Sequence, residues 1–230
     1  MKKSIIAAGL CGLIIFSGCS TMSKLASGAL TGGGAGALVG AAAGALIGKD
    51  AKGAAIGAAI GTAVGASAGA IIGNKMDKKA EELAKLEGAQ VDTLTDANGL
   101  KAIKVTFESG ILFPTNGTTL NEASKKSLGN FAVEMADLPD TDITIYGHTD
   151  NTGTAEVNER ISAQRAQAVA TYLTSKGITS NRFIAVEGKS FNEPVADNAT
   201  AEGRAQNRRV EIFISANENM VKAAESGNLQ

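Results

Sequence analysis

The residues best suited to chemistry are an acid and a base that lie close together in the second half of the chain. Asp150 lies in a glycine-bounded loop, residues 147–153, and Arg165 lies in the helix predicted to follow it. Asn158, Ser162 and Arg165 share one face of that helix because they are spaced i, i+4 and i+7. An arginine beside the apolar face is costly unless it has a partner. The residues alone favour a structural ion pair with Asp150. The alternative is a ligand that carries an amine and a carboxylate.

The groups that catalysis would need are missing around this loop. His148 is the only histidine, and no cysteine after Cys19, His-x-x-x-His motif or paired-carboxylate motif accompanies it. Nucleophilic catalysis needs a Ser or Cys with a positioned base. We therefore predict that the protein is not an enzyme and binds no cofactor or metal. His148 is expected to have a structural role at a strand end.

The charge and the glycine pattern argue against nucleic acids and phosphates as ligands. The net charge is -1, and no basic patch is interleaved with aromatic residues. The glycine repeats are not followed by the Gly-Lys-Ser/Thr of a phosphate-binding loop. We predict no nucleic-acid partner.

The N-terminus has the features of a secretory signal. Two lysines precede an uncharged apolar run, residues 4–16, which is too short to span a membrane comfortably. The following Ser-Gly-Cys resembles a bacterial lipobox. This predicts a signal peptide at residues 1–18 and acylation of Cys19, with chains such as palmitate, at the start of a lipidated tether, residues 19–31. Ser20 favours the outer membrane, by analogy with lipoprotein sorting. A plain signal peptide with an incidental cysteine is the alternative.

Glycine recurs at every fourth position in residues 32–48 and again in residues 53–73. This spacing leaves a groove on one helix face that allows close helix packing, as in membranes. In water each such glycine would cost a helix roughly 1 kcal/mol relative to alanine. We therefore predict a membrane-associated glycine-zipper helical hairpin at residues 32–73, whose segments are each about as long as one hydrocarbon core, as a transmembrane helix would be, and whose grooves allow self-association. A flexible spacer or a helical pair in the periplasm is the alternative. The charged residues 74–88 predict a short solvated helix that links to the globular half.

The second half alternates strand and helix signals. Residues 90–95 and 101–108 indicate a hairpin around a two-residue Asn98-Gly99 turn. Residues 119–122 resemble a capping box at the start of a helix. Further elements are predicted as strands at 143–146, 182–187 and 209–215 and a helix at 155–176. Strands separated by helices need crossovers and some parallel pairing. The expected fold is an α/β two-layer sandwich, a mixed βαβαβ-type sheet with two main helices on one face, preceded by the glycine-rich helical hairpin.

Four motifs together resemble the C-terminal domain of the OmpA family. They are Gly147-His148-Thr149-Asp150, Asn158-Glu159-Arg160-Ile161-Ser162, Arg165-Ala166 and the run from Gly203 to Glu211. The family binds peptidoglycan non-covalently, so the resemblance implies a peptidoglycan-binding domain at residues 89–218, followed by a flexible tail, residues 219–230. Ile161 and Pro114 depart from the family pattern, where Leu and Asp are usual.

The resemblance also implies the ligand. In the family the bound group is the diaminopimelate of the stem peptide, whose free end carries one ammonium and one carboxylate. Asp150 would accept from the ammonium, and the planar fork of Arg165 suits the carboxylate. One of the adjacent Arg208 and Arg209 is expected to be structural and the other to lie at the site. The implied ligand-binding residues are Asp150, Arg165, Asn158, Thr149, Arg208 and Asn116.

The order of these parts predicts the function. The whole chain resembles outer-membrane lipoproteins that place a glycine-zipper region before such a domain. A lipid at one end and a wall-binding domain at the other predict a tether between the outer membrane and the cell wall. The protein would be lipid-anchored in the outer membrane with its globular domain in the periplasm. The alternative is a membrane-inserting oligomer or pore built on the glycine repeats, with the domain as wall anchor.

Overall fold

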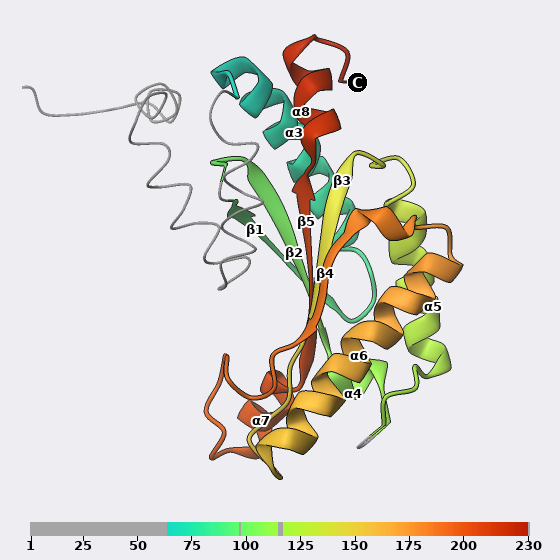
Figure 1. Ribbon diagram of the computed structural model, residues 1–230, viewed down its shortest axis with the longest axis vertical. Coiled ribbons are helices and arrows are strands. Elements are labelled where there is room, and N and C mark those ends of the chain that lie inside the picture. The colour runs from blue at the N-terminus through green and yellow to red at the C-terminus, as the bar shows by residue number, and fades with distance from the viewer. Residues whose placement is uncertain (1–63, 97, 115–116, 230) are drawn as a thin grey trace, which may run out of the picture.

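The computed structural model describes residues 64–96, 98–114 and 117–229, which form a five-stranded sheet and its helices (Figure 1). Figure 1 shows α5 and α6 side by side on one side of the sheet. The elements are α3 (Ala66–Leu83), β1 (Ala89–Thr95), β2 (Lys101–Glu108), α4 (Ser109–Leu112), α5 (Glu122–Glu134), β3 (Thr141–Gly147), α6 (Ala155–Ser175), η1 (Ser180–Arg182), β4 (Phe183–Gly188), α7 (Ala201–Asn207), β5 (Arg209–Ala216) and α8 (Glu218–Glu225).

The strand order is β1-β2-β5-β3-β4. β3 and β4 pair in parallel across the crossover through α6, and the other pairs are antiparallel. The core lies between the sheet and the helices, where Phe107, Ile145 and Ile212 of the sheet are completely buried together with Phe131 of α5 and Val169 of α6. The predicted two-layer α/β sandwich with a mixed sheet is confirmed.

Two local predictions about turns and caps are wrong. β1 and β2 form the predicted hairpin, but Thr95 pairs with Lys101, so the turn is longer than two residues. The side chain of Asp96 organises this turn by accepting from the backbone N–H of Leu100 at 2.9 Å. The predicted capping box at residues 119–122 does not form. Instead Asn121 caps α5 by accepting from the backbone N–H of Ser124 at 2.8 Å.

The charged segment after the glycine repeats is helical, but it is not a solvated linker. α3 begins at Ala66, inside the predicted glycine hairpin, and Ile72, Met76 and Leu83 are completely buried. The helix packs against β1, β2, α5 and α8. These apolar side chains recur at helical spacing on one face, a pattern obscured by the charges around them. α3 is therefore a third helix of the globular half.

A buried lysine fastens α3 to the rest of the domain. The side chain of Lys79 is 5% exposed, and its ammonium contacts Asp137 at 2.8 Å, Glu134 at 3.5 Å and Glu82 within α3. Burial alone would lower the pKa of Lys79, but Asp137 and Glu82 outweigh it and raise that pKa. The ammonium therefore stays charged, and its contacts with Glu134 at the end of α5 and with Asp137 just after that helix tie α3 to α5.

The predicted flexible tail is also wrong for most of its length. α8 occupies Glu218–Glu225, and its Met220, Val221 and Ala224 are buried. Asn217 caps this helix by accepting from the backbone N–H groups of Asn219 at 3.0 Å and Met220 at 3.1 Å. The tail folds because it has an N-cap and an apolar stripe that packs against α3.

Several predictions fall outside the described residues. They are the signal peptide at 1–18, Cys19 and the tether at 19–31, the glycine repeats up to residue 63, and Asn116. Within the part of the chain that the structure describes, no helix combines the length and the apolarity needed to cross a membrane.

Two glycines let α6 lie directly on the ends of β3 and β4. A Cβ added to Gly147 would lie 2.1 Å from the backbone O of Ser162, and one added to Gly188 would lie 2.4 Å from the backbone N of Ala163. Both positions therefore require glycine, because a side chain there would collide with the backbone of α6. The contact holds the helix face of Ser162 and Arg165 beside the loop that contains Asp150.

Candidate functional site

The site forms where β3 and β4 end side by side, because they are parallel neighbours. After Gly147, the backbone N–H of His148 donates to Arg209 O at 2.9 Å, and that of Thr149 donates to Ser190 O at 2.9 Å. The loop is thus held on both sides, and Asp150 is only 8% exposed. The carboxyl ends of parallel strands are a common place for ligand sites.

Both oxygens of Asp150 have partners. Oδ1 accepts from the backbone N–H of Thr152 at 2.8 Å, and Oδ2 accepts from Nη1 of Arg208 at 2.5 Å. Burial alone would raise the pKa of Asp150, but the bonds from Arg208 and Thr152 outweigh it and lower that pKa. Asp150 is therefore ionised, and its ion-pair partner is Arg208 rather than Arg165.

Arg165 is a buried cation that forms no ion pair with any described residue. It is 4% exposed, its Nε donates to Gly117 O at 3.0 Å, and its guanidinium carbon lies 5.3 Å from the centre of the Phe113 ring. Burial lowers the pKa of Arg165, the nearby Arg208 lowers it further, and Asp150 partly opposes this. The guanidinium is held through its Nε, which donates to Gly117, and through the contact of its planar face with the Phe113 ring. Its other two nitrogens, Nη1 and Nη2, could therefore bind an anion.

The helix residues on the same face as Arg165 fix the loop. Nδ2 of Asn158 donates to Thr152 O at 2.9 Å, and Oγ of Ser162 accepts from the backbone N–H of Ser190 at 3.1 Å. Both side chains are buried. Asn158 and Ser162 therefore hold the two loops that follow β3 and β4.

Sequence reasoning missed Ser190, which lies beside the predicted Thr149. Ser190 has a positive φ of 53°, and the hydroxyl groups of Ser190 and Thr149 are buried without a hydrogen-bond partner among the described residues. A left-handed conformation is uncommon for serine and is typical of constrained, functional positions. Recognising that β3 and β4 are parallel neighbours would have pointed to the residues just after β4.

The adjacent arginines at the start of β5 have different surroundings. The side chain of Arg209 is 4% exposed and its Nε donates to Glu211 at 2.8 Å, whereas the side chain of Arg208 is 39% exposed and reaches Asp150. Arg209 is therefore the structural one and Arg208 the one at the site. Phe113 and Gly117, which hold Arg165, had no signal in the sequence.

His148 lies in the same buried cluster as Arg209. Nε2 of His148 is 3.4 Å from Oε2 of Glu211, near enough for an ion pair but without hydrogen-bond geometry. Burial lowers the pKa of His148. Burial opposes ionisation of Glu211 as well, but His148 and Arg209 outweigh it and lower the pKa of Glu211 to about 2. The geometry agrees with a structural role for His148.

The loop between β4 and α7 is pinned by one side chain. Asn207, completely buried, accepts from the backbone N–H groups of Val195 at 2.8 Å and Ala196 at 3.0 Å, and donates to Asn198 Oδ1 at 2.9 Å. Asn198 Oδ1 in turn lies 3.4 Å from the backbone N of Asn151. The end of α7 therefore fixes both loops that border Asp150.

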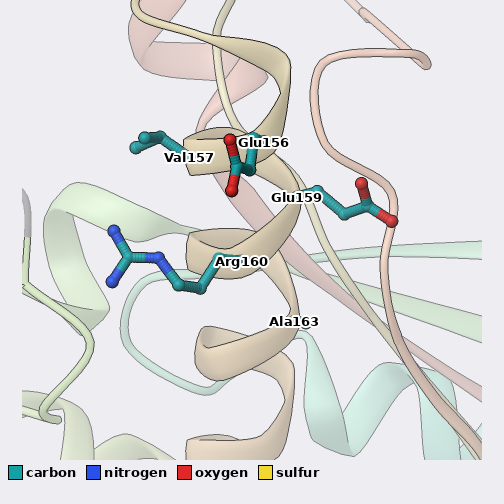
Figure 2. Close-up of a pocket in the computed structure, with 5 residues that line it drawn as sticks. All are labelled: Glu156, Val157, Glu159, Arg160 and Ala163. Carbon is teal, nitrogen blue, oxygen red and sulfur yellow. The ribbon is translucent and has the colours of Figure 1, made fainter.

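A shallow hollow on α6 lies outside this site. Figure 2 shows the side chains of Val157 and Arg160 pointing to one side of the helix and that of Glu159 to the other. None of the residues predicted to bind a ligand lines the hollow, which is formed by Glu156, Val157, Glu159, Arg160 and Ala163. Among the described residues no group of three or more His, Cys, Asp or Glu side chains is arranged to hold a metal ion.

Comparison with known proteins matches both halves of the chain. Residues 112–208 match the OmpA family, and residues 1–77 match the YMGG-like Gly-zipper family. The probable lipoprotein YiaD of Escherichia coli (strain K12) is 36% identical over 225 residues, which cover 94% of this chain and 99% of that protein.

The globular half has further relatives. The peptidoglycan-binding protein ArfA of Mycobacterium bovis is 42% identical over 114 residues, which cover 50% of this chain but only 35% of that protein. This chain therefore matches about a third of the mycobacterial protein's length. Among solved structures, the cell wall anchor of the T6SS from Pseudomonas aeruginosa superimposes with a TM-score of 0.52 at 31% identity, covering 61% of this chain and 96% of that chain.

Proposed function

The chain belongs to the OmpA family, and from this and the geometry of its site we propose that it binds peptidoglycan non-covalently through the diaminopimelate of the stem peptide. With a lipid on Cys19 it tethers the outer membrane to the cell wall. The relatives support the first part, because ArfA is named as a peptidoglycan-binding protein and the Pseudomonas structure as a cell wall anchor. The relative that matches nearly the whole chain is named as a probable lipoprotein.

The observation that carries the proposal is the buried guanidinium of Arg165, which forms no ion pair with any residue that the structure describes. Arg165 and Arg208 bring two positive charges to the site, whereas Asp150 brings one negative charge. A buried charge needs a counter-ion, and a ligand carboxylate would supply one for Arg165. The free end of diaminopimelate supplies a carboxylate for Arg165 and an ammonium for Asp150. Thr149 and Asn158 border this place, and Asn116 is carried over from the family alone.

The proposed function is binding without turnover. Asp150 is held ionised by Arg208 and the Thr152 N–H, and His148 is buried away from the solvent. Neither group is arranged to move a proton to or from a ligand, because a catalytic acid or base needs a pKa near the working pH and a path to the substrate.

Sedimentation with isolated sacculi tests the proposal. The full chain is expected to sediment with sacculi whose stem peptides contain meso-diaminopimelate, and free meso-diaminopimelate is expected to release it in a concentration-dependent way. Sacculi with lysine in place of diaminopimelate are the control, because a lysine side chain brings an ammonium without a carboxylate. Equal sedimentation with both kinds of sacculi would refute diaminopimelate recognition. Soluble muropeptides released during the incubation would indicate an enzyme instead.

The anchor is tested by the variant Cys19→Ala. We expect this variant to move from the membrane fraction to the soluble fraction, because several acyl chains on one cysteine give stable anchoring that a single weak signal does not. Mass spectrometry of the wild-type N-terminal peptide measures the acylation directly. Membrane fractionation that is unchanged in Cys19→Ala would identify the glycine repeats as the anchor.

The second candidate, a membrane-inserting oligomer, is favoured by the strict glycine period and by the YMGG-like match. The position of α3 argues against this candidate, because α3 takes up part of the second glycine segment. Ala68 and Ile72 are buried within the globular half, so the second arm of a membrane hairpin could use only residues 53–65. Those 13 residues would reach roughly 20 Å as a helix, less than the ~30 Å hydrocarbon core. The tether is therefore the better-supported function.

A further inference from the structure

Both oxygens of Asp150, where a ligand ammonium would bind, already contact other groups of the protein. Of the two Asp150 oxygens, Oδ1 is used by the backbone N–H of Thr152, and Oδ2 is used by Nη1 of Arg208 at 2.5 Å. Asp150 is buried, which leaves little room for a further cation at the same carboxylate. An ammonium that binds Oδ2 of Asp150 therefore competes with the guanidinium of Arg208.

Arg208 is built so that its side chain can leave while its backbone stays. Its backbone N–H donates to Arg204 O at 3.1 Å, and its carbonyl accepts from the N–H of Ser109 at 2.7 Å. Its side chain is 39% exposed, in contrast to the 4% of the neighbouring Arg209. A half-exposed arginine on a fixed backbone can turn its guanidinium toward water without unfolding its surroundings.

We propose that Arg208 is an internal substitute for the ligand ammonium and so determines the specificity of the site. This inference rests on the proposed function and names how the same site discriminates among ligands. A ligand displaces Arg208 from Asp150 only if it brings an ammonium for Asp150 and a carboxylate that offsets the released guanidinium. The site therefore accepts amino-acid ends and rejects simple amines.

The charges explain this selectivity. A simple amine that displaced Arg208 would pair with Asp150 and bring no acid for the two guanidinium groups, and Arg208 lies close enough to lower the pKa of Arg165. A ligand with only carboxylates can pair with Arg165 but leaves the Arg208–Asp150 pair closed. Unpaired charges in a partly buried site are costly, so neither partial ligand gains the full interaction.

Three related small molecules test the inference on the full chain. The probes are meso-diaminopimelate, pimelate, which lacks both amines, and cadaverine, which lacks both carboxylates. If Arg208 occupies Asp150 about nine-tenths of the time, it weakens the apparent affinity for a competing amine about tenfold. We therefore expect Arg208→Met to bind cadaverine about tenfold more tightly than the wild type does. Binding of pimelate should not strengthen.

Arg160→Met is the matched control. Arg160 is exposed on α6, at the hollow shown in Figure 2, and its substitution removes the same charge without freeing Asp150. Cadaverine affinity that rises in Arg208→Met but not in Arg160→Met supports the inference. Equal cadaverine affinity in the wild type, Arg208→Met and Arg208→Gln overturns it, provided that all three unfold at similar temperatures. A wild type that fails to bind meso-diaminopimelate refutes the proposed function instead, because the cadaverine comparison does not depend on that result.

Discussion

Arg165→Met is expected to abolish binding to diaminopimelate sacculi while leaving the fold intact. The guanidinium is buried, and the substitution removes the cation that would pair with the carboxylate of the ligand. Loss of one member of a buried charge pair costs about 2–5 kcal/mol, which weakens binding by roughly 30-fold to several thousand-fold. Asp150→Asn should have a similar effect because it removes the negative charge that pairs with the ammonium. Sedimentation with sacculi and titration with meso-diaminopimelate measure both losses.

Thermal unfolding of the same variants separates ligand binding from a structural role. Arg165 forms no ion pair with any described residue, so Arg165→Met relieves a desolvated charge and should leave the unfolding temperature unchanged or raise it. A structural ion pair would give the opposite result, a clear loss of stability. Arg165→Lys is the matched control, since it keeps the charge but not the planar fork and should bind with intermediate affinity. Wild-type sedimentation of both Arg165→Met and Asp150→Asn would rule out this site.

The pairing within the site shows what the sequence could and could not predict. The spacing of Asn158, Ser162 and Arg165 placed them on one helix face, and the structure brings that face to Asp150. The sequence did not indicate that Asp150 pairs with Arg208, because that contact depends on β5 lying between β2 and β3. Strand order of this kind is set by the packing of the whole sheet rather than by local sequence.

The ends of the domain were misjudged for a different reason. In α3 the charges dominate the composition, but the burial of Ile72, Met76 and Leu83 shows that spacing was the better guide. In α8, Asn217 and the apolar Met220 and Val221 carried the same kind of signal over a short segment. β2 and α6 were predicted closely because the alternation in β2 and the helical period in α6 continue through the whole element.

Gly147→Ala is expected to cause a large loss of stability for the addition of a single methyl group. The added Cβ would lie 2.1 Å from the backbone O of Ser162, 3.0 Å from its carbonyl carbon and 3.4 Å from the backbone N of Ala166. Both partners are backbone atoms of α6, so no change of rotamer can relieve the contact, and the helix must move away from β3. Overpacking typically costs about 1–3 kcal/mol, and we expect the upper end or more, a fall in unfolding temperature on the order of 10 °C.

Gly129→Ala is the control that decides whether the contact, and not the alanine, is responsible. Gly129 lies inside α5, where an added Cβ would meet only the hydroxyl of Tyr172, at the ordinary distance of 3.7 Å. This substitution should stabilise the protein by about 0.5–1 kcal/mol, because glycine is a poor residue for a helix interior.

In Gly147→Ala, by contrast, the displaced helix carries Asn158 and Arg165 away from Asp150, so affinity for meso-diaminopimelate should fall together with stability. Equal unfolding temperatures for Gly147→Ala and the wild type would mean that α6 does not rest on the end of β3, and the close approach that assembles the site would be wrong.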